Sequence, residues 1–92
     1  MRQYDVSILA VRGQKLTRTP HSFRVRPDRQ AGQEPIGMAL ARISRDSGMQ
    51  VLAVQDAGYD KHGRFYQATF GRPVKGTNGS VPMSEVHLKI DV

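Results

Sequence analysis

The sequence contains no cysteine. This excludes a disulfide framework, a thiol nucleophile and a thiolate metal site. The sequence also lacks any apolar run close to the roughly 20 residues that a membrane-spanning helix needs, and it does not open with a signal-peptide pattern. These absences are compatible with a reducing compartment, and we expect a cytoplasmic protein without a membrane partner.

Motifs of metal binding and catalysis are also missing. The three histidines, His21, His62 and His87, lie far apart and lack the HxH or HxxxH spacing that brings two imidazoles to one metal ion. The glycine-rich stretch 71–80 lacks the GxxxxGK[ST] order of a phosphate-binding loop. No pair of carboxylates and no nucleophile beside a base stands out. We therefore expect neither an enzyme nor a protein that holds a metal ion or cofactor.

Arginine, in contrast, is abundant. The 14 lysines and arginines exceed the 8 acidic residues and give a net charge of +6. All of this excess lies in residues 1–45, since basic and acidic residues balance in the second half. The planar guanidinium binds phosphate and carboxylate groups better than the lysine ammonium does. The distribution favours an acidic partner, although a solvated basic face is the common alternative.

The stretch 35–54 is expected to organise the fold. Its apolar residues Ile36, Ala39, Leu40 and Ile43 follow the spacing of one helical face. Pro35 suits the first helical position, and Gly48 can adopt the left-handed conformation that ends a helix. The uninterrupted apolar run 51–54 then predicts a strand at the centre of a sheet, or one covered on both faces.

Alternating apolar and polar residues predict four more strands, at 3–11, 22–26, 64–70 and 84–92. Residues 57–63 are expected to form a turn, and residues 71–82 the longest structureless segment. The order is β-β-α-β-β-β. We therefore expect one α+β domain over residues 1–92, with an antiparallel or mixed sheet of four or five strands and one helix packed on one face.

The leading candidate site is a basic set in the first half of the chain. Arg24 and Arg26 lie two residues apart on an expected strand, so their side chains share one face at roughly 7 Å, near the spacing of successive phosphates. The complete set is Lys15, Arg18, Arg24, Arg26 and Arg29. Such a set would follow a nucleic-acid backbone without reading bases. The alternative is a charged outer face whose only effect is solubility.

A second candidate surrounds the expected hairpin turn. It comprises Tyr59, Lys61, His62, Arg64 and Tyr66. Aromatic residues between cations are typical of proteins that bind single-stranded nucleic acid, where bases stack on rings. His62 and Arg64 would also suit a metal-free ribonuclease, but composition alone gives no catalytic geometry. We assign this arm to binding.

The alternative function is a protein-interaction or inhibitor module that binds an acidic surface of another protein. Met38, Arg42 and Arg45 lie on the outer side of the expected helix, and a flexible methionine flanked by arginines is a common interface composition. The strand expected at 84–92 would also allow a homodimer if it forms an unpaired sheet edge.

Overall fold

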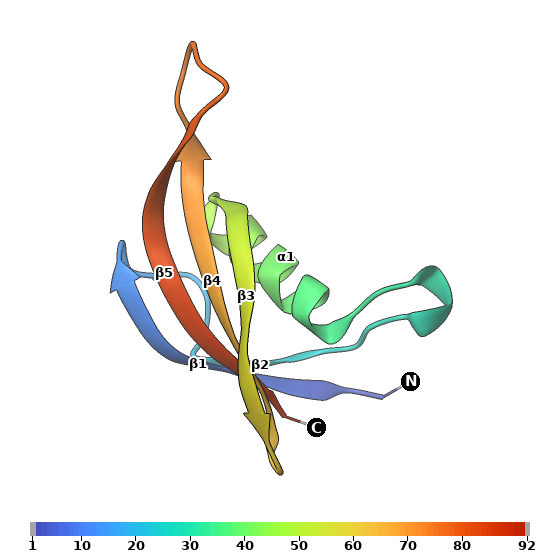
Figure 1. Ribbon diagram of the computed structural model, residues 1–92. Helices are drawn as coiled ribbons and strands as arrows, with labels where there is room; N and C mark the ends of the chain where they lie inside the picture. Colours follow the sequence, from blue (N-terminus) through green and yellow to red (C-terminus); the bar gives the residue numbers. More distant parts are fainter. Residues whose placement is uncertain (1, 92) are drawn as a thin grey trace.

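The computed structural model describes residues 2–91. In chain order its elements are β1 (Tyr4–Gly13), β2 (Ser22–Val25), the 3₁₀ helix η1 (Arg29–Ala31), α1 (Pro35–Ser47), β3 (Gln50–Asp60), β4 (Gly63–Pro73) and β5 (Ser80–Asp91), as Figure 1 shows. The expected α+β fold with one α-helix is confirmed for residues 2–91, most of which are sheet. Of the two expected sheet types, antiparallel or mixed, the antiparallel one is present.

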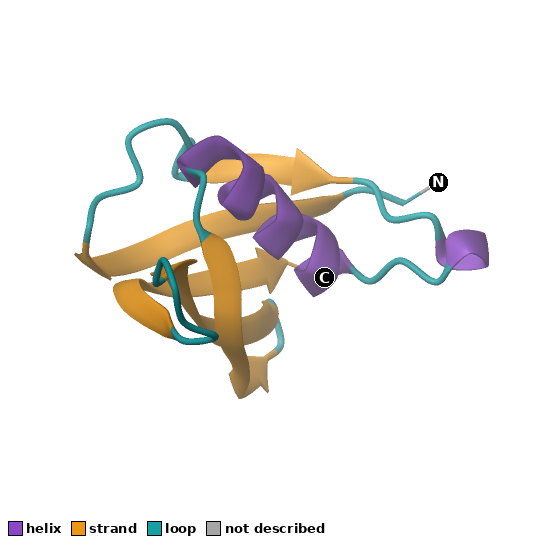
Figure 2. Ribbon diagram, turned by 90° about the horizontal axis from the view of Figure 1, so that it is seen from above, coloured by secondary structure: helices purple, strands orange, loops and turns teal. Residues whose placement is uncertain are grey.

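The five strands form one antiparallel sheet in the order β2-β1-β5-β4-β3. β5 is the central strand and pairs with β1 and β4, whereas β2 and β3 form the two edges. α1 connects these edges and lies across one face of the sheet, and η1 projects beyond it (Figure 2). Within residues 2–91, no helix covers the other face.

Local signals determine both ends of α1. Pro35 occupies the start of the helix, where its missing N–H costs no hydrogen bond. Gly48 ends it with φ 73°, and its N–H donates to the carbonyl of Ser44. Ala39, Leu40 and Ile43 are buried, as the spacing of the apolar residues predicts.

The core lies between α1 and the sheet. Besides the helix residues it contains Tyr4, Val6, Ile8, Phe23, Val25, Met49, Ala68, Phe70, Val86, Leu88 and Ile90. In β5 these alternate with Glu85, His87 and Lys89, which lie on the helix-free face. This alternation is expected for an antiparallel sheet with one face on the core and one in solvent.

The prediction that 51–54 forms a central, covered strand is wrong. β3 lies at an edge of the sheet, and the side chains of Val51 and Val54 remain 38% and 47% exposed. α1 runs straight into β3 through Gly48, so only Met49 at the junction reaches the core, where it is 1% exposed. β3 also continues to Asp60, which makes the first part of the expected turn 57–63 strand.

Half of the expected structureless segment 71–82 is strand. Pairs between Gly71 and Pro82 and between Pro73 and Ser80 extend the β4–β5 hairpin, so only residues 74–79 form the loop. A Cβ at Gly71 would lie 2.1 Å from the carbonyl oxygen of Val81. Glycine here permits close approach of two backbones, a role that sequence composition does not distinguish from loop formation.

The strand expected at 84–92 is the central strand β5, which hydrogen-bonds on both sides. The condition for a homodimer through this strand, an unpaired edge, is therefore not met, because its backbone groups already have partners within the sheet. Val92, the last residue of that prediction, lies outside the described residues.

Truncation of Ile43 tests the packing of α1 on the sheet. Ile43 is fully buried, so we expect Ile43→Ala to lower the free energy of unfolding by about 2–5 kcal/mol and Ile43→Val by about 0.5–1.5 kcal/mol. Val81→Ala, at a position 51% exposed, should change it by less than about 0.5 kcal/mol. Urea denaturation followed by circular dichroism measures all three, and equal effects of Ile43→Ala and Val81→Ala would contradict this packing.

Candidate nucleic-acid interface

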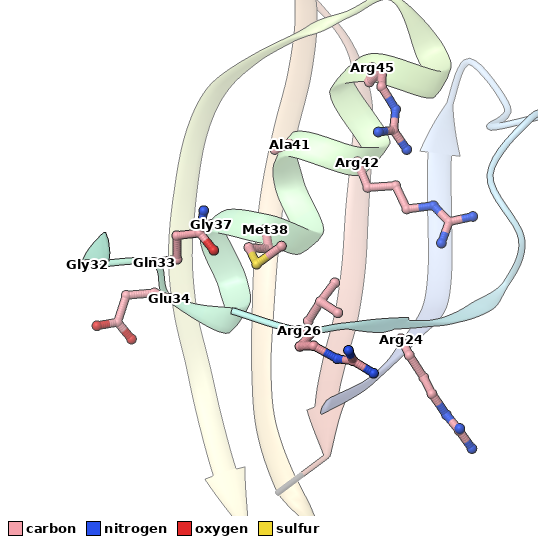
Figure 3. Close-up of a pocket in the computed structure, with 11 residues that line it drawn as sticks. Arg24, Arg26, Gly32, Gln33, Glu34, Gly37, Met38, Ala41, Arg42 and Arg45 are labelled. Atoms are coloured by element: carbon pink, nitrogen blue, oxygen red, sulfur yellow. The ribbon is translucent and has the colours of Figure 1, made fainter. Parts of the chain in front are cut away.

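An open groove of about 800 Å³ separates the edge strand β2 from α1. Its lining is Arg24, Val25, Arg26, Gly32, Gln33, Glu34, Gly37, Met38, Ala41, Arg42 and Arg45 (Figure 3). The groove therefore combines residues of two separate candidate sites. These are Arg24 and Arg26 of the basic set, and the residues on the outer side of the helix. Four arginines line the groove with one carboxylate, that of Glu34.

Arg42 is held in place from two sides. Its guanidinium carbon lies 4.6 Å from the centre of the Phe23 ring on β2, and its Nε lies 3.5 Å from Oδ2 of Asp46, one turn along the helix. A cation over an aromatic face is attracted by the electrons of the ring. Arg42 thus connects the helix to the edge strand while its side chain stays about one third exposed.

Arg45 and Arg26 are the more accessible cations of the groove. Nε of Arg45 lies 3.7 Å from Oδ1 of Asp46, the carboxylate that also faces Arg42, and the Arg45 side chain is 76% exposed. Arg26 follows β2 directly, is exposed and forms no ion pair or hydrogen bond within residues 2–91. One carboxylate shared by two guanidinium groups leaves positive charge available to an anion.

Arg24 differs from its neighbours. Its Nε donates a hydrogen bond to Oδ1 of Asp5 on β1 at 3.0 Å, and Figure 3 shows its side chain pointing away from α1. Arg24 and Arg26 are both exposed, yet Arg24 has an acidic partner. The two arginines are therefore unequal as candidates for phosphate binding.

Met38 lies between the arginines of the groove (Figure 3). It is partly buried and packs against the core cluster. It is therefore not an isolated exposed apolar residue, and its thioether gives the groove one adaptable apolar contact.

Lys15 and Arg18 lie at the far end of α1. Together with Arg45 and Asp46 they line a smaller cavity of about 330 Å³ beside Gly48. Thr19 supports this loop, because its hydroxyl donates to Oδ2 of Asp46 at 3.4 Å and its side chain is buried. Since Arg45 lines both spaces, the loop cations continue the groove toward the C-terminal end of the helix.

Arg29 lies apart from this groove. Its Nη2 donates a hydrogen bond to the hydroxyl of Tyr4 at 2.9 Å, and this bond raises the pKa of the guanidinium. A third cavity, of about 520 Å³, brings Arg29 close to Arg64 and Tyr66 of the hairpin arm. Its acidic lining includes Glu34 and Asp91, so positive charge is less concentrated here than in the groove.

Arg2 and Tyr4 also line this third cavity, although no sequence pattern indicated them as site residues. Arg2 lies over the Tyr4 ring, with 5.2 Å between its guanidinium carbon and the ring centre. In the sequence, Tyr4 is one of the alternating residues that predict the strand at 3–11. Its neighbours Arg29 and Tyr66 are far away in the sequence, so no local pattern connects them.

The rest of the arm lies at the β3–β4 turn. The Tyr59 side chain is 78% exposed, and the Arg64 guanidinium carbon lies 5.8 Å from its ring centre. Nη1 of Arg64 also lies 3.3 Å from Oδ2 of Asp56. Lys61 and His62 are exposed at the turn itself. β3 is the edge opposite to β2, so Tyr59, Lys61 and His62 at the turn lie away from the arginine groove.

Within residues 2–91, no three His, Cys, Asp or Glu side chains are arranged to hold a metal ion. No helix in this range is long and apolar enough to cross a membrane. Comparisons of the sequence with protein-family models and with curated proteins, and of the structure with solved structures, give no match.

The carboxylate of Asp60 holds the turn of the arm, which gives a test by pH titration. Its Oδ1 accepts hydrogen bonds from the backbone N–H groups of His62 at 2.7 Å and Gly63 at 3.1 Å. These bonds favour the ionised form and lower the pKa of Asp60, with the His62 bond as the main cause. We expect its carboxyl NMR signal to titrate below the range of an ordinary aspartate.

Because the pKa is lowered by folding, the stabilisation from Asp60 is present above the ordinary aspartate pKa and is lost as pH falls through the lowered value. Asp60→Asn should lack this transition and identify the signal. A midpoint at or above the ordinary aspartate value would contradict the geometry of the turn.

Proposed function

We propose that this protein is a non-enzymatic binding module that contacts the phosphate backbone of a nucleic acid through the groove between β2 and α1. The observation that carries the proposal is that Arg26, Arg42 and Arg45 all line one open groove. Figure 3 shows their side chains together with that of Met38 in this region. Guanidinium groups bind phosphate through two parallel hydrogen bonds, which suits arginine better than lysine.

The surroundings of the groove favour an anionic ligand. Asp46 is the carboxylate close to both Arg42 and Arg45, and Glu34 lies at the opposite end of the helix. The positive charge of these two arginines therefore exceeds the negative charge beside them. Lys15 and Arg18 extend the basic lining beyond Arg45. A phosphate chain lying along α1 would meet these cations in succession.

Contacts with the backbone are favoured over contacts with bases. The lining of the groove includes no aromatic side chain, and Phe23 beneath Arg42 is buried. Base recognition in single strands relies on exposed rings for stacking. The exposed ring of Tyr59 lies near the other edge of the sheet, so binding in the groove should depend weakly on nucleotide sequence.

Salt dependence provides the first test. We expect fluorescence anisotropy with labelled oligonucleotides to show binding at low salt. The three groove arginines alone should contribute about −3 to the slope of log K against log salt on duplex DNA, and phosphate contacts from Lys15 and Arg18 should make it steeper. The double variant Arg26→Ala/Arg45→Ala should weaken binding and reduce the steepness of the slope by about 2. Arg42 is left intact in this test because it also packs on Phe23.

The matched control is Arg12→Ala/Lys75→Ala, which removes the same charge at exposed positions outside the groove. If both double variants weaken binding equally, the effect comes from net charge and the groove is not the site. If the unaltered protein fails to bind at low salt, the nucleic-acid proposal is wrong.

A second candidate function is the capture of an acidic protein surface by the same groove. The position of Met38 among the arginines favours it, since interface centres often combine a flexible apolar side chain with arginine. In that case Met38→Ala should weaken binding to the partner by more than 1 kcal/mol and leave oligonucleotide binding unchanged. Affinity capture followed by titration with the identified acidic protein would measure this, and a partner insensitive to Met38→Ala would contradict it.

A further inference from the structure

The two edges of the sheet differ in their protection against pairing with another strand. An edge strand exposes unpaired backbone N–H and C=O groups, and proteins protect such edges with short strands, charges and proline. β2 has all three features, because it is 4 residues long, contains Arg24, and is followed by Arg26 and Pro27. A second copy of β2 would pair there only by bringing arginine side chains of like charge together.

β3 has few of these features. It is 11 residues long, and residues 50–55 contain neither charge nor proline. Val51 and Val54 are exposed on this strand. A neutral segment of β-branched and small residues at an open edge is a suitable template for another strand.

We propose that β3 pairs antiparallel with β3 of a second copy of this chain, so that the protein forms a two-fold symmetric dimer with a continuous ten-stranded sheet. A second copy fits the charges. The chain carries a net charge of +6, yet its basic excess comes from residues 1–45, whereas β3 belongs to the half in which charges balance. In a second copy, residues 50–55 offer β3 an uncharged segment with the same exposed valines, and Asp56 and Asp60 lie beyond that segment.

The register follows from the irregularities of β3. Its pairing with β4 shifts between Val51 and Ala53 and again between Asp56 and Tyr59, so residues 53–56 form the regular segment. In a two-fold antiparallel pair, residues opposite each other lie on the same face of the sheet. A two-fold axis through Val54 satisfies this condition, places Val54 against its own copy and places Ala53 opposite Gln55.

This arrangement keeps the basic surfaces apart. A two-fold axis perpendicular to the sheet leaves both copies of α1 on the same face. β2 is the edge opposite to β3, so the two arginine grooves would lie at the far ends of the combined sheet, separated by roughly 40 Å from strand spacing. The dimer does not depend on the proposed nucleic-acid function, and its test needs no ligand.

Sedimentation equilibrium across a range of protein concentrations tests the dimer. We expect the mass of the unaltered protein to rise from 10.3 kDa toward twice that value. Val54→Lys should keep the protein monomeric, since it places two ammonium groups together at the axis. Val81→Lys makes the same chemical change at a similarly exposed site away from β3 and should still allow dimers.

A monomeric mass for the unaltered protein at its highest soluble concentration would overturn the proposal. Dimers that persist in Val54→Lys, or that disappear equally in both lysine variants, would also overturn the assignment to β3. Circular dichroism shows whether each variant is folded.

A cysteine test does not depend on the lysine variants. Because the chain has no cysteine, Val54→Cys introduces a single thiol. Directly opposed residues in an antiparallel pair have Cα atoms about 4.5–5.5 Å apart, a separation compatible with a disulfide. Mild oxidation should therefore convert Val54→Cys to a covalent dimer that reductant reverses, seen by electrophoresis without reductant. Ser22→Cys on β2 and Val81→Cys should remain monomers, and equal crosslinking of all three would overturn the register.

Discussion

The position of α1 is the constraint on which the other features depend. The helix follows β2 at one edge of the sheet and leads to β3 at the other. Its 13 residues span about 20 Å, and its apolar face buries Ala39, Leu40 and Ile43 against the sheet. Because one face of α1 is fixed on the core, its other face stands beside β2 and forms one wall of the arginine groove.

Arg42 shows how packing and charge are combined in this groove. Its contact with Phe23 ties the helix to the edge strand, so the guanidinium is held before any ligand arrives. Holding a long side chain in advance lowers the entropy lost on binding. Arg26 and Arg45 lack such an aromatic support, and their charges are more exposed to screening by salt.

The local features of the fold were predictable from the sequence. The apolar spacing from Ile36 to Ile43 and the glycine at Gly48 predicted the helix and its end, because these signals act within a few residues. The edge position of β3 was not predictable, since an apolar run of four residues shows a tendency to form strand and carries no information about neighbours. The extension of the β4–β5 hairpin through Gly71 was missed for a similar reason. A glycine needed for close backbone contact and a glycine in a loop look alike in sequence.

The candidate site was predictable only in part. Residue type and charge identified the arginines, but their grouping depends on pairs distant in sequence. Phe23 lies 19 residues before Arg42, and Asp5 lies 19 residues before Arg24. The first contact brings Arg42 to the edge strand and the second gives Arg24 an acidic partner. The alternation of polar and apolar residues along a single strand predicts neither of these two contacts.

The central place of β5 has a consequence for how the protein folds as it is synthesised. β5 is the last strand in chain order, yet it alone joins the β1–β2 pair to the β3–β4 pair. Until it leaves the ribosome, β1 and β4 each lack a neighbour and the core lacks Val86, Leu88 and Ile90. Pairs such as Val6 with Ile90 also close very long loops, which slows folding. Closure of the sheet is therefore a late step, and the nascent chain passes through a stage with unpaired strands before it reaches its final form.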